Sequence, residues 1–154
     1  MALAQPFAVQ QFAEATLMSP AGGGKAEKAI IFIRILVGWV FLSEGIQKFL
    51  FPNDLGAGRF HRLGIPWPHE TAILVAVIEI LCGTAVLLGM EMRWATIALL
   101  CVNLGAIATT KVPLYRHTDI WTTLHESRVD ASMFFGLIFL LIAGSGSYAL
   151  ENRR

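Results

Sequence analysis

The feature that most constrains the fold is a run of twenty residues, 71–90, that is almost entirely apolar and contains one ionisable side chain, Glu79. A helix of this length, at about 1.5 Å per residue, crosses the roughly 30 Å hydrocarbon core of a bilayer. A carboxylate at that depth costs about 2.5–3.5 kcal/mol on insertion scales. We therefore expect residues 71–90 to span a membrane, with Glu79 facing protein or water rather than lipid.

Three further apolar segments have similar lengths. The composition is also that of a membrane protein, with 55% hydrophobic and 15% charged residues. The chain is therefore predicted to be all-α, an integral membrane four-helix bundle of antiparallel transmembrane helices. Its spans are expected at about 29–51, 71–90, 94–110 and 131–150, the third ending at Pro113.

The segments outside the spans carry less information. Residues 1–28 are expected to form a surface or disordered tail, and residues 29–154 the membrane domain. The net charge of +1 makes no case for nucleic-acid binding. Lysines and arginines divide evenly between the two sides, and a narrow preference places both termini in the cytoplasm.

Two charged residues in the first span are predicted to pair. Glu44 and Lys48 are four residues apart and lie on one helix face. Their charges neutralise each other, which lowers the free-energy cost of placing both side chains inside the membrane. Arg34 is closer to the start of the span, and we expect it to reach the near interface.

The buried polar residues are expected at similar depths in the membrane. If the second and third spans form a hairpin about residues 91–92, Glu79 lies level with Asn103, its expected hydrogen-bond partner. Glu44 and Glu79 both lie about 10–12 Å below the same interface. The sequence therefore predicts a polar pocket open on one side. A site for a ligand, proton or quinone and a purely structural role in helix packing both remain open.

The polar segment before the fourth span is expected to cover the mouth of this pocket. It contains His125, Arg128 and Asp130, with Asp130 expected to cap the fourth span, and Lys111 lies at the same interface. The spacing of the histidines and carboxylates matches no standard metal site, so no metal is expected. Cys82 and Cys101 are interpreted as small apolar residues rather than a redox pair.

Short motifs are distributed along the spans and the loops. They are Arg34, Glu44-Gly45, Lys48-Phe49, Gly64-Ile65-Pro66, Glu79, Gly83, Leu87-Leu88-Gly89, Arg93, Lys111 and residues 144–151. In these motifs the chain resembles the DoxX family of small four-span bacterial membrane proteins, over roughly residues 30–151. Terminal Glu151 stands where Asp is commoner in that family, and residues 125–130 are similar to one of its branches.

The resemblance implies a subunit of the bacterial plasma membrane that associates with respiratory or redox enzymes. We expect no catalysis by this chain alone and no covalently bound cofactor. The ligand would be a quinone or another small lipophilic molecule, and the partners the lipid bilayer and redox-enzyme subunits. The alternatives are a structural or assembly subunit without a ligand and, ranked lowest, a small-solute transporter. The expected ligand-binding residues are Glu44, Lys48, Glu79, Asn103, Lys111, His125, Arg128 and Asp130.

Overall fold

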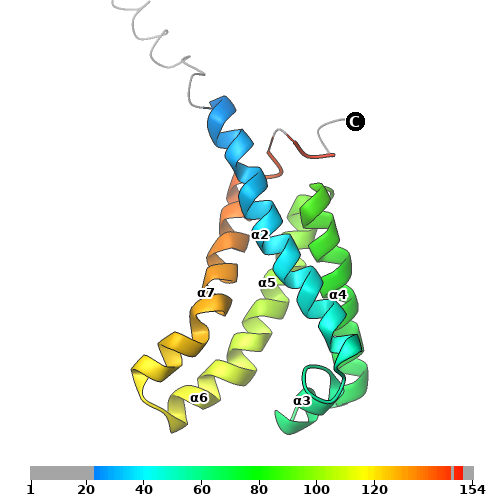
Figure 1. Ribbon diagram of the computed structural model, residues 1–154, viewed down its shortest axis with the longest axis vertical. Helices are drawn as coiled ribbons and strands as arrows, with labels where there is room; N and C mark the ends of the chain where they lie inside the picture. Colours follow the sequence, from blue (N-terminus) through cyan, green and yellow to red (C-terminus); the bar gives the residue numbers. More distant parts are fainter. Residues whose placement is uncertain (1–22, 147, 151–154) are drawn as a thin grey trace, which may run out of the picture.

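A computed structural model describes residues 23–146 and 148–150 (Figure 1). Most of the expected tail, residues 1–22, lies outside the described residues. Residues 23–28, which we had assigned to the tail, form the first turns of a long helix.

All regular secondary structure in the described residues is helical and none is strand, which confirms the predicted all-α class. Three stretches are long and apolar enough to cross a membrane: Glu27–Leu50, Pro68–Leu88 and Met92–Arg116. The elements are α2 (Gly23–Leu50), α3 (Ala57–Arg62), α4 (Pro68–Leu88), α5 (Met92–Ala106), the π-helix η1 (Ile107–Lys111), α6 (Val112–His117) and α7 (Ile120–Ala143).

The last helix differs from the expected fourth span. α7 begins eleven residues before position 131 and carries three charged residues, Glu126, Arg128 and Asp130, in its first half. It ends at Ala143 because Gly144 adopts φ 77°, in the left-handed region. Only thirteen residues of the expected 131–150 span are therefore helical.

The prediction that Pro113 ends the third span was wrong. Helical structure continues from α5 through η1 into α6, as far as His117. A proline removes one backbone donor and its ring crowds the carbonyl four residues earlier. The wider π-turn directly before Pro113 accommodates this misfit, as π-bulges do inside α-helices.

The helices form two pairs that share an apolar core. α2 packs mainly on α4 and α5 on α7, and the tight turn at Gly89 joins α4 to α5. The pairs lie closest where α2 begins and α7 ends, and they diverge towards α3 and α6 (Figure 1). The core lies at the closed end, where Val37, Val86, Leu99, Leu137 and Leu140 are fully buried.

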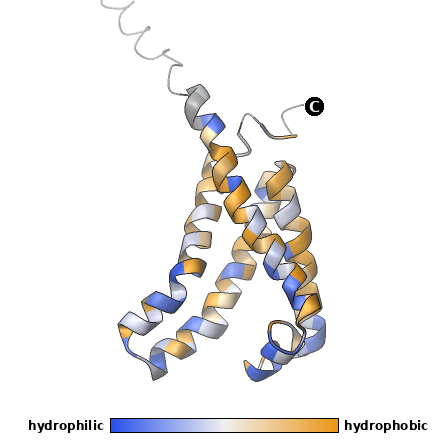
Figure 2. Cartoon of the chain, viewed as in Figure 1, coloured by the Kyte–Doolittle hydropathy of each residue, from blue (hydrophilic) through white to orange (hydrophobic). Residues whose placement is uncertain are grey.

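The outer surface fits a hydrocarbon solvent. Large apolar side chains such as Trp39, Leu81, Phe135 and Ile142 point outwards and are exposed. Hydrophilic residues concentrate around α3, α6 and the start of α7, at the divergent end of the molecule (Figure 2). The chain is a membrane protein with several apolar helices.

Small residues allow α2 and α4 to approach each other closely. A Cβ added at Gly83 would lie 2.8 Å from the backbone nitrogen of Leu42, and one at Gly45 would lie 2.8 Å from the carbonyl oxygen of Ala76. Backbones that meet this closely are typical of helix pairs in membranes, where small residues line the interface. This contact brings the polar residues of α2 and α4 together.

Candidate functional site

The first polar cluster joins α2 to α4 through Lys48. Its Nζ atom donates to Oε2 of Glu79 over 2.7 Å and lies 3.6 Å from Oε2 of Glu44. The Lys48 and Glu79 side chains are 10% and 6% exposed. The predicted Glu44–Lys48 pair is therefore confirmed, but the shorter and more buried contact is the one between helices.

The position of Glu79 follows from the face of α4 that packs on α2. Ala76, Glu79 and Gly83 are buried on this face, spaced three and four residues apart. An added Cβ at Gly45 of α2 would lie 3.0 Å from Cβ of Glu79. The glycine leaves room for the glutamate and puts its carboxylate within reach of Lys48, one turn further along α2.

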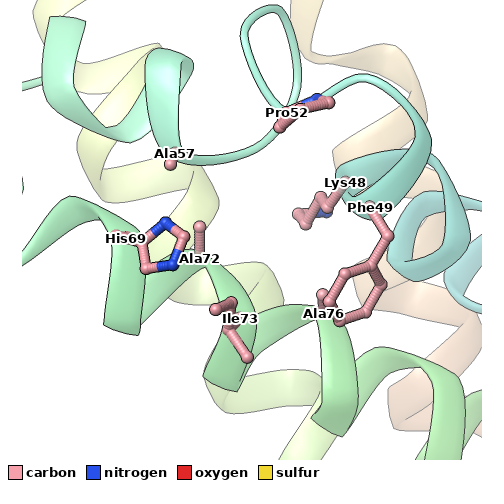
Figure 3. Close-up of a pocket in the computed structure, with 8 residues that line it drawn as sticks. All are labelled: Lys48, Phe49, Pro52, Ala57, His69, Ala72, Ile73 and Ala76. Carbon is pink, nitrogen blue, oxygen red and sulfur yellow. The ribbon is translucent and has the colours of Figure 1, made fainter.

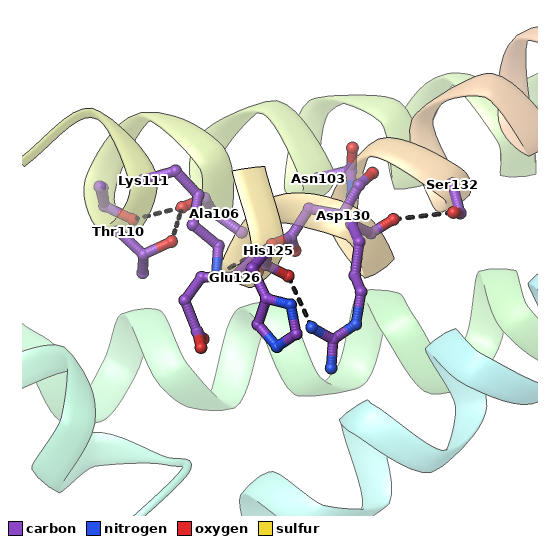
Figure 4. A network of polar contacts seen from close by, with 10 residues as sticks. Asn103, Ala106, Thr110, Lys111, His125, Glu126, Asp130 and Ser132 are labelled. Atoms are coloured by element: carbon purple, nitrogen blue, oxygen red, sulfur yellow. Dashed lines mark hydrogen bonds and ion pairs between the residues drawn. The ribbon is translucent and has the colours of Figure 1, made fainter. Parts of the chain in front are cut away.

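The second polar cluster lies between α5–η1 and α7 (Figure 4). Lys111 Nζ lies 3.3 Å from Oδ2 of Asp130 and donates to the carbonyl of Glu126 over 2.7 Å. Asn103 Nδ2 donates to the carbonyl of Asp130 over 3.4 Å, and its buried Oδ1 has no partner.

The expected Asn103–Glu79 hydrogen bond was therefore wrong. Equal depth in the membrane did not bring the two side chains together, because Glu79 faces α2 and Asn103 faces α7. The structure divides the predicted single cluster into two, one in each helix pair.

His125 and Arg128 lie on the outer side of the second cluster. Both are exposed, and Arg128 Nη1 donates to the carbonyl of His125 over 2.8 Å, within the same helix (Figure 4). Neither side chain has a described contact with Glu44, Lys48 or Glu79.

Asp119, and not Asp130, caps α7. Its Oδ2 accepts from the backbone N–H groups of Trp121 and Thr122, and its Oδ1 accepts from the Thr122 hydroxyl over 2.6 Å. These bonds stabilise the carboxylate, with the Thr122 hydroxyl contributing most, and hold the pKa of Asp119 below its ordinary value. The expected cap at Asp130 was wrong because α7 begins at Ile120, well before that residue.

The core-facing surfaces of α2 and α7 become accessible at the divergent end. Glu44 shares a helix face with the buried Val37 and Phe41, yet its side chain is 47% exposed. Asp130 lies one turn before the buried Met133 on α7 and is 27% exposed. Glu44 and Asp130 therefore lie on the core-facing sides of α2 and α7 at the end where the two pairs diverge, and we call the region between them the inner opening.

A separate small pocket lies on the other side of Lys48, between the end of α2, α3 and the start of α4 (Figure 3). Its volume is about 110 Å³. Cavities of roughly 150 Å³ hold benzene, so this pocket is too small for a quinone ring. Of the expected site residues it includes Lys48 alone, and its lining is Lys48, Phe49, Pro52, Ala57, His69, Ala72, Ile73 and Ala76.

Arg34 has a structural role that the sequence analysis missed. It is 2% exposed, and its guanidinium donates to the carbonyls of Val86, Leu87 and Ser145 over 2.8–3.0 Å. The positive charge of Arg34 also interacts favourably with the helix dipole, whose negative end lies at the C-terminus of α4. One signal in the sequence could have predicted this contact. Arg34 and the end of the second span are expected at the same depth in the membrane, and the last carbonyls of a helix have no partner within that helix.

The described residues contain no group of three or more histidine, cysteine or acidic side chains that could hold a metal ion. Cys82 and Cys101 are both free thiols.

Comparison with known proteins gives two matches. The sequence model of the DoxX family matches residues 29–112. An uncharacterized membrane protein of Mycobacterium tuberculosis is 48% identical over 131 residues, which cover 81% of this chain and 80% of the relative. No solved structure matches the chain.

Proposed function

The chain belongs to the DoxX family, and we propose that it is a four-span subunit of a quinone-linked redox complex in the bacterial plasma membrane. In this proposal the subunit is not catalytic alone. It holds a quinone or similar lipophilic molecule in the inner opening, next to an enzyme subunit that carries out the redox chemistry.

The position of α7 supports four spans. α7 runs from the divergent end back to the end where α2 begins, beside α5 (Figure 1). Its last thirteen residues are apolar or small, and Met133, Leu137 and Leu140 lie in the shared core. The segment after α7 returns to the closed end of α4, where the Leu150 N–H donates to the carbonyl of Leu88. With four spans, both termini of the chain would lie on the same side of the membrane, and in this proposal that side is the cytoplasm.

The accessibility of Glu44 and Asp130 on core-facing surfaces is the observation that carries the proposal. Ligand sites in helix bundles are built from side chains on facing helices. A head group in the inner opening would meet Glu44 and Lys48 on one side and Lys111 and Asp130 on the other. Its apolar tail would lie among lipid chains at the gap between α2 and α7.

The test is native mass spectrometry of the protein purified from its own membranes in a mild detergent. We expect a quinone and at least one redox subunit to co-purify, and Asp130→Asn and Glu44→Gln to reduce the bound quinone at least tenfold, which corresponds to about 1.4 kcal/mol. Glu70→Gln is the matched control, because Glu70 is exposed in the first turn of α4. The proposal fails if no quinone or partner co-purifies and respiration is unchanged in the variants.

A structural role is the second candidate, and the buried Lys48–Glu79 contact favours it. The contact lies beside the glycines that set the α2–α4 distance, so it specifies how these helices pack. In that case Glu79→Gln lowers the yield of assembled complex without changing turnover per assembled complex. Solute transport has the least support, because the apolar core closes the other end of the bundle.

A further inference from the structure

The first polar cluster has more acidic than basic groups. Glu44, Lys48 and Glu79 carry one net negative charge when all three are ionised. Both carboxylates share one ammonium group, whose remaining described bond goes to the carbonyl of Glu44 over 3.4 Å. Among the helices packed on α4, α2 alone contributes charged groups to this cluster, as far as the chain is described. One carboxylate charge therefore stays uncompensated at membrane depth, which is costly.

The small pocket gives this cluster a route to water. Lys48 forms part of its wall next to Ala76, one turn before Glu79 on α4, and His69 lies across the pocket beside Ala57 and Ala72 (Figure 3). A volume of about 110 Å³ exceeds the roughly 10–15 Å³ of probe-occupied space that one water molecule needs. Water that enters beside α3 can therefore reach the Lys48 side chain, which is 10% exposed.

The opposite end of the bundle offers no comparable route. The fully buried Val37, Val86 and Leu137 fill the space between the helices there. Arg34 ties α2 to the end of α4 and to Ser145, with all its described bonds to backbone carbonyls. Exchange with water therefore takes place at the divergent end of the bundle, where the pocket beside α3 reaches Lys48.

We propose that Glu44, Lys48 and Glu79 form a one-sided proton-binding site, which takes up a single proton through the pocket between α2, α3 and α4. Lys48, which lines the pocket and donates to Glu79, passes one proton to the Glu79 carboxylate and is reprotonated by a hydronium ion in the pocket water. An O–H bond forms on the carboxyl group, and the hydronium becomes water. The site is then neutral, because one carboxylate remains paired with the Lys48 ammonium. This site does not depend on a quinone in the inner opening.

A proton suits this site better than a metal cation does. Hard cations such as Ca²⁺ take six to eight oxygen ligands. The remaining pocket lining is apolar except for the His69 imidazole, so it supplies no further oxygen ligand from a side chain.

The proposal is tested by infrared spectroscopy of the full chain in lipid nanodiscs during a pH titration. We expect the wild type to show the C=O stretch of one protonated carboxyl group, which disappears as the pH rises and shifts in D₂O. Glu44→Gln and Glu79→Gln should each remove this band, because the remaining carboxylate is then neutralised by Lys48. Glu70→Gln should keep it. Glu44→Gln also covers the case in which Glu79→Gln does not fold, since Glu44 is half-exposed.

A second measurement tests the route through the pocket. Ala57→Phe places a ring in the pocket, and Ala131→Phe makes the same change at an exposed position on α7. We expect Ala57→Phe to slow deuterium exchange of the carboxyl band at least about tenfold, the equivalent of 1.4 kcal/mol in the barrier, and Ala131→Phe to leave it unchanged.

Three outcomes would overturn the proposal. The first is the absence of a titrating carboxyl band in the wild type, and the second is its survival in both glutamine variants. The third is loss of the band when Na⁺ replaces choline at constant pH, which would identify a metal cation as the ligand. Equal exchange rates in the two phenylalanine variants would refute the route through the pocket.

Discussion

Replacing Gly83 by alanine should destabilise the α2–α4 pair, whereas the same change at Gly105 should not. At Gly83 the new Cβ would lie 2.8 Å from the Leu42 nitrogen, while ordinary contact begins at 3.4 Å, so α2 must move by about 0.6 Å. All three close neighbours are backbone atoms that no side-chain rotation can relieve: the Leu42 nitrogen, the Gly38 oxygen at 3.1 Å and the Leu42 Cα at 3.3 Å. Gly105 has no atom within 4 Å of an added Cβ.

The expected difference can be worked out because both glycines are helical. Each alanine gains up to about 1 kcal/mol of helix propensity, and this gain cancels when the two variants are compared. Overpacking costs typically about 1–3 kcal/mol. Gly83→Ala should therefore have a free energy of unfolding about 1–3 kcal/mol lower than Gly105→Ala.

The measurement is equilibrium unfolding in mixed micelles, with increasing denaturing detergent and tryptophan fluorescence as the signal. Because the shift of α2 also moves Lys48 away from Glu79, the carboxyl infrared band should change in Gly83→Ala alone. If the two variants unfold at the same detergent concentration, or if Gly83→Ala is the more stable, the α2–α4 contact is not as close as described.

Three further predictions concern other parts of the chain. Arg34→Met should lower the free energy of unfolding by about 2–4 kcal/mol, because it leaves buried carbonyls without a donor. Limited proteolysis after Ala143 should then increase, whereas unchanged cleavage would contradict the anchoring role of Arg34. Asn103→Leu should be neutral or stabilising in detergent unfolding, since it removes a buried acceptor without a partner, and a clear loss of stability would show that Oδ1 is satisfied. For Asp119, whose pKa is lowered in the folded chain, the capping contribution should be complete above the ordinary aspartate pKa and be lost as the pH falls through the folded value. The protection factors of the Trp121 and Thr122 amides, taken against the intrinsic exchange rate at each pH, should therefore fall on acidification in the wild type and be low at every pH in Asp119→Ala.

The predicted contact within one helix, between Glu44 and Lys48, was correct, and the predicted contact between helices, between Glu79 and Asn103, was wrong. The four-residue spacing of Glu44 and Lys48 decides their contact, because a helix places such residues on one face. The partner of Glu79 depends on the orientation of α4 about its own axis. The depth of a residue along the hairpin carries no information on that orientation. That orientation follows from Gly38, Gly45 and Gly83, whose close contacts turn Glu79 towards α2.

Local departures from the prediction have local physical causes. Pro113 was expected to end a helix, but a π-turn, η1, absorbs the missing hydrogen bond and the steric conflict. Asp119 lies at the true start of α7, and its cap was missed because the fourth span was expected to begin at about residue 131.

The sequence by itself determined that the chain lies in a membrane, that its fold is helical and to which family it belongs. These properties depend on the length and apolarity of segments and on short motifs. The sequence also placed the charged residues at their depths. Only the tertiary structure decided that the helices form two diverging pairs, that the polar residues separate into two clusters, and that Arg34 binds the end of α4. The physical reason is that these features depend on which helix faces pack against each other. In lipid, small residues and unpaired backbone carbonyls determine those faces more than hydrophobicity does, because both the helix surface and the lipid are apolar.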